Sequence, residues 1–274
     1  MGDLLEVVTR ASNAAYEALN ALSGRSWTFD TLVALPIDNA LVKAGPLGAC
    51  FAYAWHAATD ASEKQRRRLV LVGTLLSLCI VIATTKTLAG EVFLPRPFIL
   101  AQNVYVIEDG RLAPAERLRY RPPLAGESRD RFESLQRGEA TENDLSSFPS
   151  DHAGFYIALA LGIFLACRVA GMVAIGWTVV MILLSRIITG MHSPLDIVAG
   201  GGLGVAVMLA IHWALNRPAR RLGCRVADLT MRYEGLASAV LFLALFEVVS
   251  TLANSRELAE STRDVASGLV GRWS

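Results

Sequence analysis

Six long apolar stretches constrain this chain more than any other feature. They cover residues 44–59, 69–85, 153–167, 169–185, 197–215 and 235–253, and each is nearly or entirely free of Asp, Glu, Lys and Arg. A bilayer core is crossed by about 20 apolar residues, and flanking Lys and Arg side chains can extend shorter stretches. We therefore expect an all-α fold, an integral membrane bundle of about six transmembrane helices. The alternative is a large soluble all-helical protein with buried helices, which the repeated lack of polar faces disfavours.

Basic residues mark three of the turns between these stretches. Along the chain they are Lys64, Arg66, Arg67, Arg68, Arg168, Arg217, Arg220, Arg221 and Arg225. If the stretches cross in alternation, the three turns share one side of the membrane, which the positive-inside rule makes cytoplasmic. Residues 86–152 and the turn at 186–196 then belong to the outer face. The compact size favours a bacterial plasma membrane, with the outer face toward the periplasm or exterior.

The chain divides into three segments on this basis. Residues 217–274 add a cytoplasmic basic turn, a further transmembrane helix and a tail. Residues 44–216 form the transmembrane core, including a polar outer loop at 98–148 whose length is typical of a lid or binding loop. Residues 1–43 lack the basic start of a signal peptide and instead predict an amphipathic helix that lies on the membrane or packs on the bundle. Its helically spaced apolar residues are Leu4, Leu5, Val8, Ala11, Ala15, Ala18, Leu19 and Leu22.

Charge and cysteine content exclude several classes of protein. Net charge is only +1, from 26 basic and 25 acidic side chains, so there is no basic field of the kind that binds nucleic acid. The four cysteines show no metal-binding spacing, and three of them lie inside apolar stretches. We therefore predict neither a zinc module nor a disulfide framework.

Polar and ionisable residues gather at the outer ends of the predicted helices. They are Lys86, Arg96, Ser150, Asp151, His152, Arg186, His192 and Asp196. Such residues are costly near a membrane, which makes them candidates for function. Arginine forks, a lysine, a serine and the N–H groups of a helix start together suit a phosphate group. A divalent metal would need carboxylates where this chain has cations, so we expect neither a metal nor another cofactor.

The two histidines add the groups for phosphoryl transfer. Asp196 follows His192 by four residues, so it lies one helical turn from it and is able to accept a proton from one ring nitrogen. The other nitrogen of His192 is then a nucleophile, and His152 is an acid for the leaving group. Ser150 also fits the N-cap of the third predicted helix, and Asp151 fits either a first-turn partner of the helix dipole or a substrate-selecting residue.

Three motifs resemble those of the type 2 phosphatidic acid phosphatase superfamily. Residues 185–196, SRIITGMHSPLD, are similar to the family's SRxxxxxHxxxD motif, and residues 149–152, PSDH, resemble its PSGH motif. Lys86 with Arg96 and Pro97 looks like the first motif, KxxxxxxRP. The order of the motifs and the long loop between the first two also fit, and the resemblance covers about residues 44–215.

This resemblance implies a metal-independent lipid phosphatase that works through a phosphohistidine. His192 would be the nucleophile, Asp196 its orienting partner and His152 the acid that protonates the leaving oxygen. The phosphoryl oxygens would be bound by Lys86, Arg96, Ser150 and Arg186.

Two positions depart from the family pattern. Nine residues rather than six separate Lys86 from Arg96, and the expected lysine position is Ala89. The three extra residues move Lys86 by about 4.5 Å along a helix, which puts its reach to the phosphate in question. Asp151 replaces the usual glycine, and PSDH resembles the bacterial undecaprenyl diphosphate phosphatases of the superfamily.

The leading hypothesis is therefore a phosphatase for a lipid phosphate or diphosphate, with polyprenyl (undecaprenyl) diphosphate as the first choice of substrate. Phosphatidic acid and phosphatidylglycerol phosphate are the second. A lipid phosphotransferase is a rival with the same intermediate. A transporter or lipid-phosphate-binding protein is a rival of another class, although a pure binding site has no use for a nucleophile and an acid. The expected partners are the lipid substrate and the bilayer, with no nucleic acid.

Overall fold

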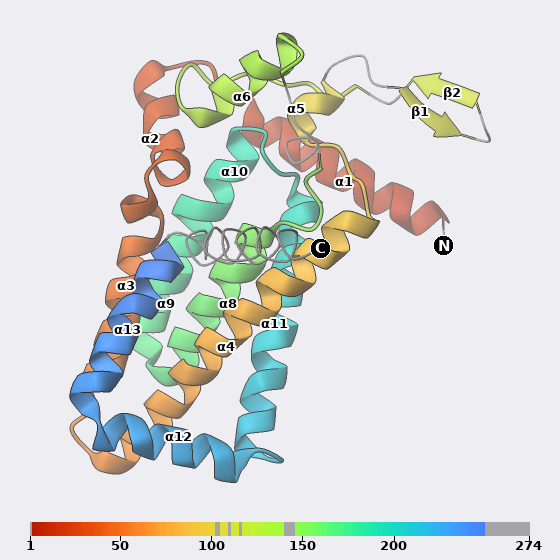
Figure 1. Cartoon of the computed structure of the whole chain (residues 1–274). Coiled ribbons are helices and arrows are strands. Elements are labelled where there is room, and N and C mark those ends of the chain that lie inside the picture. Colours follow the sequence, from red (N-terminus) through yellow and green to blue (C-terminus); the bar gives the residue numbers. More distant parts are fainter. Residues whose placement is uncertain (1, 102–104, 109–110, 115–116, 140–145, 250–274) are drawn as a thin grey trace, which may run out of the picture.

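A bundle of long helices makes up most of the molecule (Figure 1). The computed structural model describes residues 2–101, 105–108, 111–114, 117–139 and 146–249. Within those ranges each of the six apolar stretches falls on a helix, and the all-α prediction is confirmed, with one antiparallel hairpin of β1 (Tyr105–Glu108) and β2 (Arg111–Pro114) added. The bundle helices are α3 (Ala40–His56), α4 (Ala61–Glu91), α8 (Asp151–Ala166), α9 (Arg168–Trp177), the π-helical η1 (Thr178–Leu183), α10 (Leu184–Ile188), α11 (Pro194–Asn216) and α13 (Glu234–Val249).

Several of these helices are long and apolar enough to cross a membrane. Three qualify by length and composition within the described residues: α4, the continuous run Arg168–Ile188, and α11. A fourth crossing results if α12 (Arg220–Arg232) and α13, bent by 106° at their junction, count as one span. Apolar α8 is shorter, with 16 residues. The chain is an integral membrane protein, and the number of six spans stays a prediction.

Helix α8 lies at the centre of the bundle, between α4, α9 and α11 (Figure 1). Its Phe155, Leu159 and Ile163 are fully buried. On α11, a Cβ atom at Gly200 would lie 2.1 Å from the carbonyl oxygen of Ser150, and one at Gly204 would lie 2.2 Å from that of Gly154. These glycines therefore let two helix backbones touch, which fixes the start of α8 against the start of α11.

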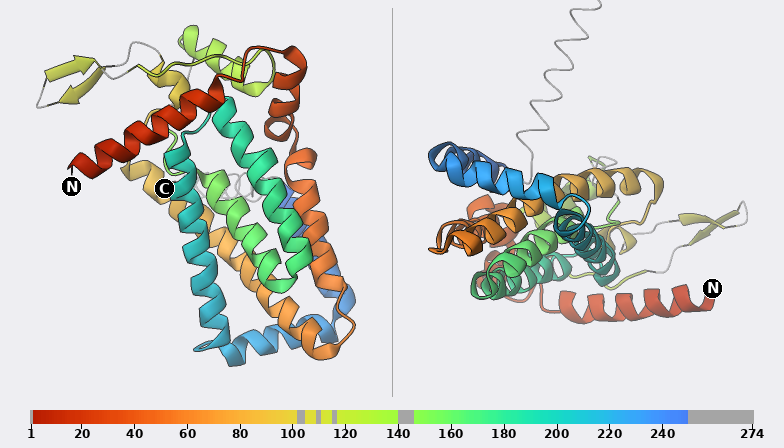
Figure 2. Two further views of the ribbon diagram at one scale, coloured as in Figure 1. Left: turned by 180° about the vertical axis from the view of Figure 1, so that it is seen from behind. Right: turned by 90° about the horizontal axis from the view of Figure 1, so that it is seen from below.

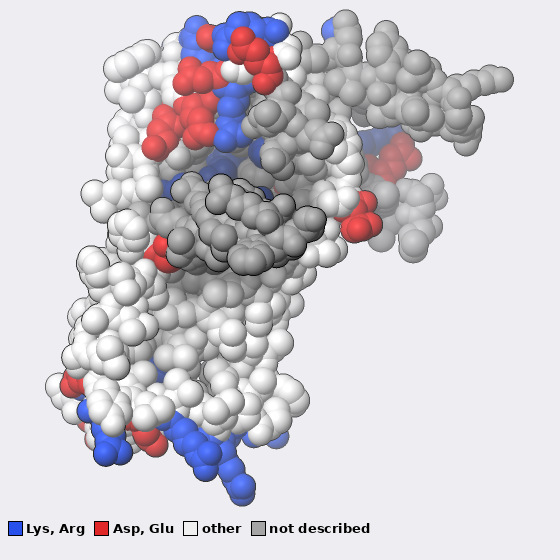
Figure 3. Space-filling view, viewed as in Figure 1, with Lys and Arg blue, Asp and Glu red and all other residues white. Residues whose placement is uncertain are grey.

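The basic turns meet at one end of the bundle, as predicted. Arg66 donates to the carbonyl oxygens of Leu165 and Ala166 at the end of α8. Gln65 bonds to Asp228 of α12 at 2.6 Å, and Lys64 pairs with Glu234 at 2.7 Å. The space-filling view shows basic side chains at this lower end, a mainly uncharged middle, and a second charged region at the upper end (Figure 3).

The opposite end carries α1 (Gly2–Asn20), α2 (Trp27–Asp38), α5 (Pro97–Leu100), α6 (Glu127–Gln136) and the hairpin (Figure 2). Helix α1 lies across this end and extends beyond the bundle. It buries Tyr16 and Asn20 against the bundle while Val7 and Val8 stay exposed. Asn20 donates to the carbonyl oxygen of Ile188 at 2.8 Å, and Tyr16 and Leu19 pack in the hydrophobic core, so both polar and apolar contacts attach the helix to the bundle.

Parts of the predicted segments lie outside the described residues. These parts are the tail from residue 250, the side chains of Leu4 and Leu5, and positions 102–104, 109–110, 115–116 and 140–145 of the outer loop. The rest of that loop is largely built into α5, the hairpin and α6. The three segment boundaries remain predictions.

Candidate active site

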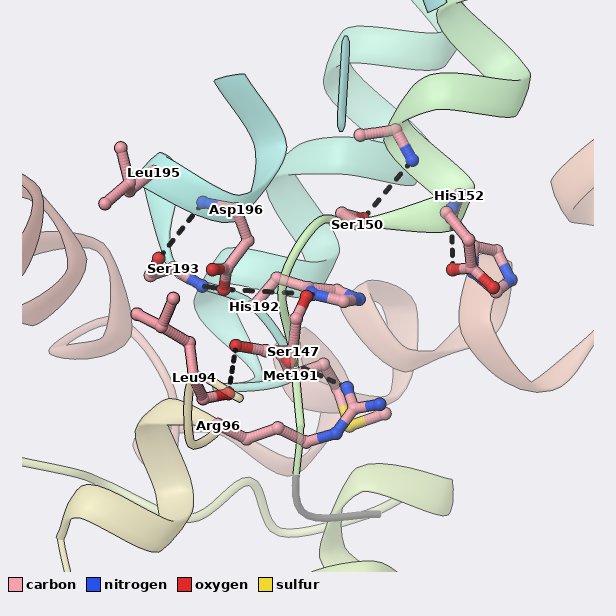
Figure 4. A network of polar contacts seen from close by, with 12 residues as sticks. Leu94, Arg96, Ser147, Ser150, His152, Met191, His192, Ser193, Leu195 and Asp196 are labelled. Carbon is pink, nitrogen blue, oxygen red and sulfur yellow. Dashed lines mark hydrogen bonds and ion pairs between the residues drawn. The ribbon is translucent and has the colours of Figure 1, made fainter. Parts of the chain in front are cut away.

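Chain segments far apart in sequence bring predicted site residues together. Figure 4 shows five of them side by side: Arg96, Ser150, His152, His192 and Asp196. Six of the eight line two adjoining pockets. The smaller, of about 240 Å³, is lined by Arg96, Arg131, Asp151, His152, Arg186, Met191 and His192. The larger, of about 570 Å³, is lined by Thr85, Lys86, Ala89, Gly90, Phe93, Arg96, Ser146, Ser147, Phe148, Pro149, Asp151 and His192. His192 borders both, whereas Ser150 and Asp196 lie behind the walls.

His192 lies in the tight turn between α10 and α11. The backbone N–H groups of Met191 and His192 both donate to the carbonyl oxygen of Arg186, and Gly190 supplies the positive φ of 80° that the turn needs. Nδ1 of His192 lies 3.1 Å from the backbone carbonyl oxygen of Ser147. Because a carbonyl oxygen only accepts, Nδ1 carries the proton and Nε2 keeps its lone pair.

The charge state of His192 follows from its surroundings. The side chain is 4 % exposed, and burial lowers the pKa of the imidazole well below its ordinary value. The nearby cations Arg96 and Arg186 lower this pKa further. A neutral ring with a free Nε2 is the form that attacks phosphorus.

Asp196 sits on the first turn of α11, where it caps the helix. Its Oδ2 accepts the N–H of Ser193 at 2.7 Å, while its own N–H donates to the Ser193 hydroxyl, a complete capping box. The helix starts only at Pro194, so the expectation that His192 and Asp196 share a helical turn is wrong. Asp196 Oδ2 lies 3.9 Å from His192 Nδ1, close enough to act on it electrostatically.

Asp151 and His152 form a close pair at the start of α8. Oδ1 of Asp151 lies 2.7 Å from Nδ1 of His152, and its Oδ2 lies 3.9 Å from the ammonium of Lys86. A carboxylate only accepts, so Nδ1 of His152 carries a hydrogen in this contact and Nε2 is the nitrogen left facing away from Asp151. The side chain of Lys86 is 55 % exposed and lines the larger pocket beside Asp151.

Ser150 joins the start of α8 to the start of α11. Its hydroxyl accepts the N–H of Ala153, which makes it the N-cap of α8, and its own N–H donates to the carbonyl oxygen of Asp196 at 3.2 Å. The N-cap role is thereby confirmed. The contact with a phosphate remains a prediction.

Arginines surround the smaller pocket on several sides. Arg96 precedes α5, and its Nη1 donates to the carbonyl oxygen of Met191 at 2.9 Å. Arg186 of α10 is 5 % exposed, and its Nε has no hydrogen-bond partner among the described residues. A buried guanidinium N–H beside a cavity is a donor ready for an anion.

Three contributors were missed in the sequence. Ser147 offers only its backbone oxygen to His192, which no side-chain pattern reveals. Arg131 of α6 is one of many arginines in the polar outer loop, and nothing in its neighbours singles it out. Lys43 of α3 interacts electrostatically with Arg186 and His152, and its position just before the first apolar stretch was its only signal.

The described residues contain no group of three or more His, Cys, Asp or Glu side chains arranged to hold a metal ion. The expected independence of metal remains a prediction for experiment.

Comparison with known proteins identifies the family. The PAP2 superfamily model matches residues 68–220, more than half of the chain, and the protein belongs to this superfamily. The match contains all eight predicted site residues. The bacitracin transport permease protein BcrC of Bacillus licheniformis is 39% identical over 70 residues, which is 25% of this chain and 33% of that protein. The alignment thus spans about a third of the relative's length. No solved structure matches the chain.

Proposed function

We propose that the protein is a membrane phosphatase that hydrolyses a lipid diphosphate at the outer face of a bacterial plasma membrane. Polyprenyl diphosphate, such as undecaprenyl diphosphate, is the first choice of substrate. One observation carries the proposal: His192, with Nε2 unprotonated, lines the same small cavity as His152 and three arginines. Family membership supports a lipid phosphate as the substrate class.

In the first step, Nε2 of His192 attacks the terminal phosphorus of the lipid diphosphate. A phosphorus–nitrogen bond forms while the bond from that phosphorus to the bridging oxygen breaks. Protonated His152 gives its Nε2 proton to the bridging oxygen, so the lipid monophosphate leaves as a stable species. Asp151 holds His152 in the correct orientation, and its carboxylate favours the protonated ring, which burial and the nearby Arg186 disfavour.

In the second step, water cleaves the phosphohistidine. His152, now neutral, takes a proton from the water as its oxygen attacks phosphorus, and the phosphorus–nitrogen bond breaks. Inorganic phosphate leaves, His192 regains its lone pair and His152 is protonated again. In this scheme only His152 changes its protonation state, while His192 keeps its Nδ1 hydrogen throughout.

The remaining polar groups stabilise charge on the phosphoryl oxygens. Arg96 and Arg186 are placed to bind those oxygens at the wall of the cavity. We assign a neutral contact to Ser150, whose N-cap bond from Ala153 leaves its own hydroxyl hydrogen free to donate. Lys86 lines the larger pocket, so we assign it to attracting the anionic head group rather than to the reacting phosphorus.

The choice of lipid substrate depends on one residue of the second motif. Asp151 in place of the usual glycine favours a polyprenyl diphosphate, as in the enzymes that the PSDH motif resembles. Phosphatidic acid and phosphatidylglycerol phosphate remain the second choice. The relative is named a bacitracin transport permease, so a transport or binding role is the alternative. The two histidines in one cavity argue against that alternative.

The test is phosphate release by the purified, detergent-solubilised protein in the presence of EDTA. Undecaprenyl diphosphate, phosphatidic acid and phosphatidylglycerol phosphate are compared, each with the wild type and with His192→Ala. We expect release from the diphosphate that the variant loses. Release that survives in the variant would exclude this mechanism. If no lipid is hydrolysed, adding candidate acceptors tests the phosphotransferase.

A further inference from the structure

Helix α6 of the outer loop is fastened to the bundle at its start. Just before it, the N–H of Leu124 donates to Asp30 of α2 at 2.9 Å, and at its first residue the N–H of Glu127 donates to Asp38 at 3.1 Å. Later in the helix, the ring of Phe132 packs edge-on against Tyr120 at 5.1 Å between centroids. The helix is therefore a fixed wall above the site.

Arg131 is the residue through which this wall reaches the cavity. Its guanidinium lines the smaller pocket with both histidines, while its Nη2 pairs with Glu127 at 2.6 Å one turn earlier. Glu127 thus holds the guanidinium in place. Arg131 borders only the smaller pocket, the side of His192 on which His152 also lies.

Three guanidinium groups and one carboxylate, that of Asp151, border this cavity. Arg96 and Arg186 already flank His192, and Arg131 makes a third guanidinium in the same wall. Lys43 adds charge nearby, since it interacts electrostatically with Arg186 and Glu127. A diphosphate carries more negative charge and more acceptor oxygens than a monophosphate, and a third arginine fork suits the additional oxygens.

We infer that Arg131 binds the second phosphate group of a diphosphate substrate, the group that leaves with the lipid, and so selects diphosphates over monophosphates. This inference rests on the proposed phosphatase function. His152 protonates the bridging oxygen, so the leaving phosphate lies on the His152 side of His192, which is the side that Arg131 borders. In this role Arg131 is a specificity residue, and the attack by His192 does not require it.

The test measures binding, so that it does not depend on turnover. Full-length protein in detergent is titrated by calorimetry with methylenediphosphonate, which carries two phosphonate groups, and with methylphosphonate, which carries one. The variants are Arg131→Gln, Arg131→Lys and the control Arg129→Gln. Arg129 lies on the same helix and has the same kind of pair, with Glu133 at 2.8 Å, but it does not line the cavity.

We expect the wild type to prefer the diphosphonate. Arg131→Gln should weaken diphosphonate binding by about tenfold or more and change methylphosphonate binding by less than about twofold, because one charge-assisted contact is lost. Arg131→Lys should keep part of the preference, and Arg129→Gln all of it. An unchanged preference in Arg131→Gln, an equal loss for both ligands, or no preference in the wild type would overturn the inference. The rate of lipid diphosphate hydrolysis, measured in parallel for the wild type, tests the proposed function separately.

Discussion

The contact between Asp151 and His152 predicts that removing the carboxylate slows the hydrolysis of substrates whose leaving group must be protonated. Oδ1 of Asp151 lies 2.7 Å from Nδ1 of His152, and the carboxylate stabilises the protonated ring that gives up a proton to the leaving group. Asp151→Asn keeps the size and an acceptor oxygen but removes the charge. The substitution therefore isolates the electrostatic part of the contact.

The expected loss follows from the kind of bond. A hydrogen bond to a charged group contributes about 1.5–3 kcal/mol, which corresponds to a rate loss of about 10- to 100-fold for a lipid diphosphate, whose leaving group needs a proton. The p-nitrophenolate of p-nitrophenyl phosphate leaves without protonation, so the rate of hydrolysis of this substrate should fall by less than about threefold.

The assay is kcat for both substrates in the wild type, Asp151→Asn and Asp151→Gly, the residue usual in the family motif. Asp151→Gly should show the same split between the two substrates. Equal losses on both would mean that Asp151 supports the fold or the phosphate site rather than the acid, and no loss on either would refute the role of the contact.

Three further predictions concern packing, pH and metal. Gly200→Ala should cost about 1–3 kcal/mol of stability and most of the activity, because the added Cβ would lie 2.1 Å from the backbone oxygen of Ser150. The control is Gly202→Ala, whose Cβ would meet nothing within 4 Å. The control should keep the thermal midpoint and the turnover of the wild type. Burial and the nearby Arg96 and Arg186 depress the pKa of His192 in the folded protein. The contribution of His192 to stability is therefore full above about pH 6.5, the ordinary pKa of histidine. It is lost as the pH falls below that value, because the unfolded chain then takes up a proton that the folded protein does not. His192→Gln should therefore reduce the drop in thermal midpoint between pH 7 and pH 5, and an undiminished drop would contradict the assignment. EDTA should leave the rate of phosphate release unchanged, and a strong loss restored by a divalent cation would argue for a metal enzyme.

The helices of the core were predictable because their signal is local. Each apolar stretch predicts a buried or membrane-embedded helix without any knowledge of its neighbours, and the basic turns predict which ends lie together. The stripe of glycines from Gly200 to Gly204 likewise predicts a close helix contact, and the structure places α8 there. The π-helical turn at Thr178–Leu183 lies within a uniformly apolar run that gives no sign of it.

The sequence predicted six of the residues that line the two pockets, but few of their contacts. The motifs name His152 and His192, but which atom holds each ring depends on chain segments that meet only in the fold. The spacing of His192 and Asp196 suggests a helical pair, yet the proline at position 194 starts the helix later and turns the carboxylate into a cap. Arg131 reaches the cavity through the docking of α6 on α2, a long-range contact that no local pattern encodes.

The central claim is that His192 carries the phosphoryl group between the two steps. The most direct measurement is rapid quenching of the enzyme with lipid diphosphate labelled in its terminal phosphate, followed by mapping of the labelled residue. We predict an acid-labile, base-stable phosphohistidine at position 192, absent from His192→Ala. Label on another residue, or rapid phosphate release with no labelled enzyme at any time, would contradict the account.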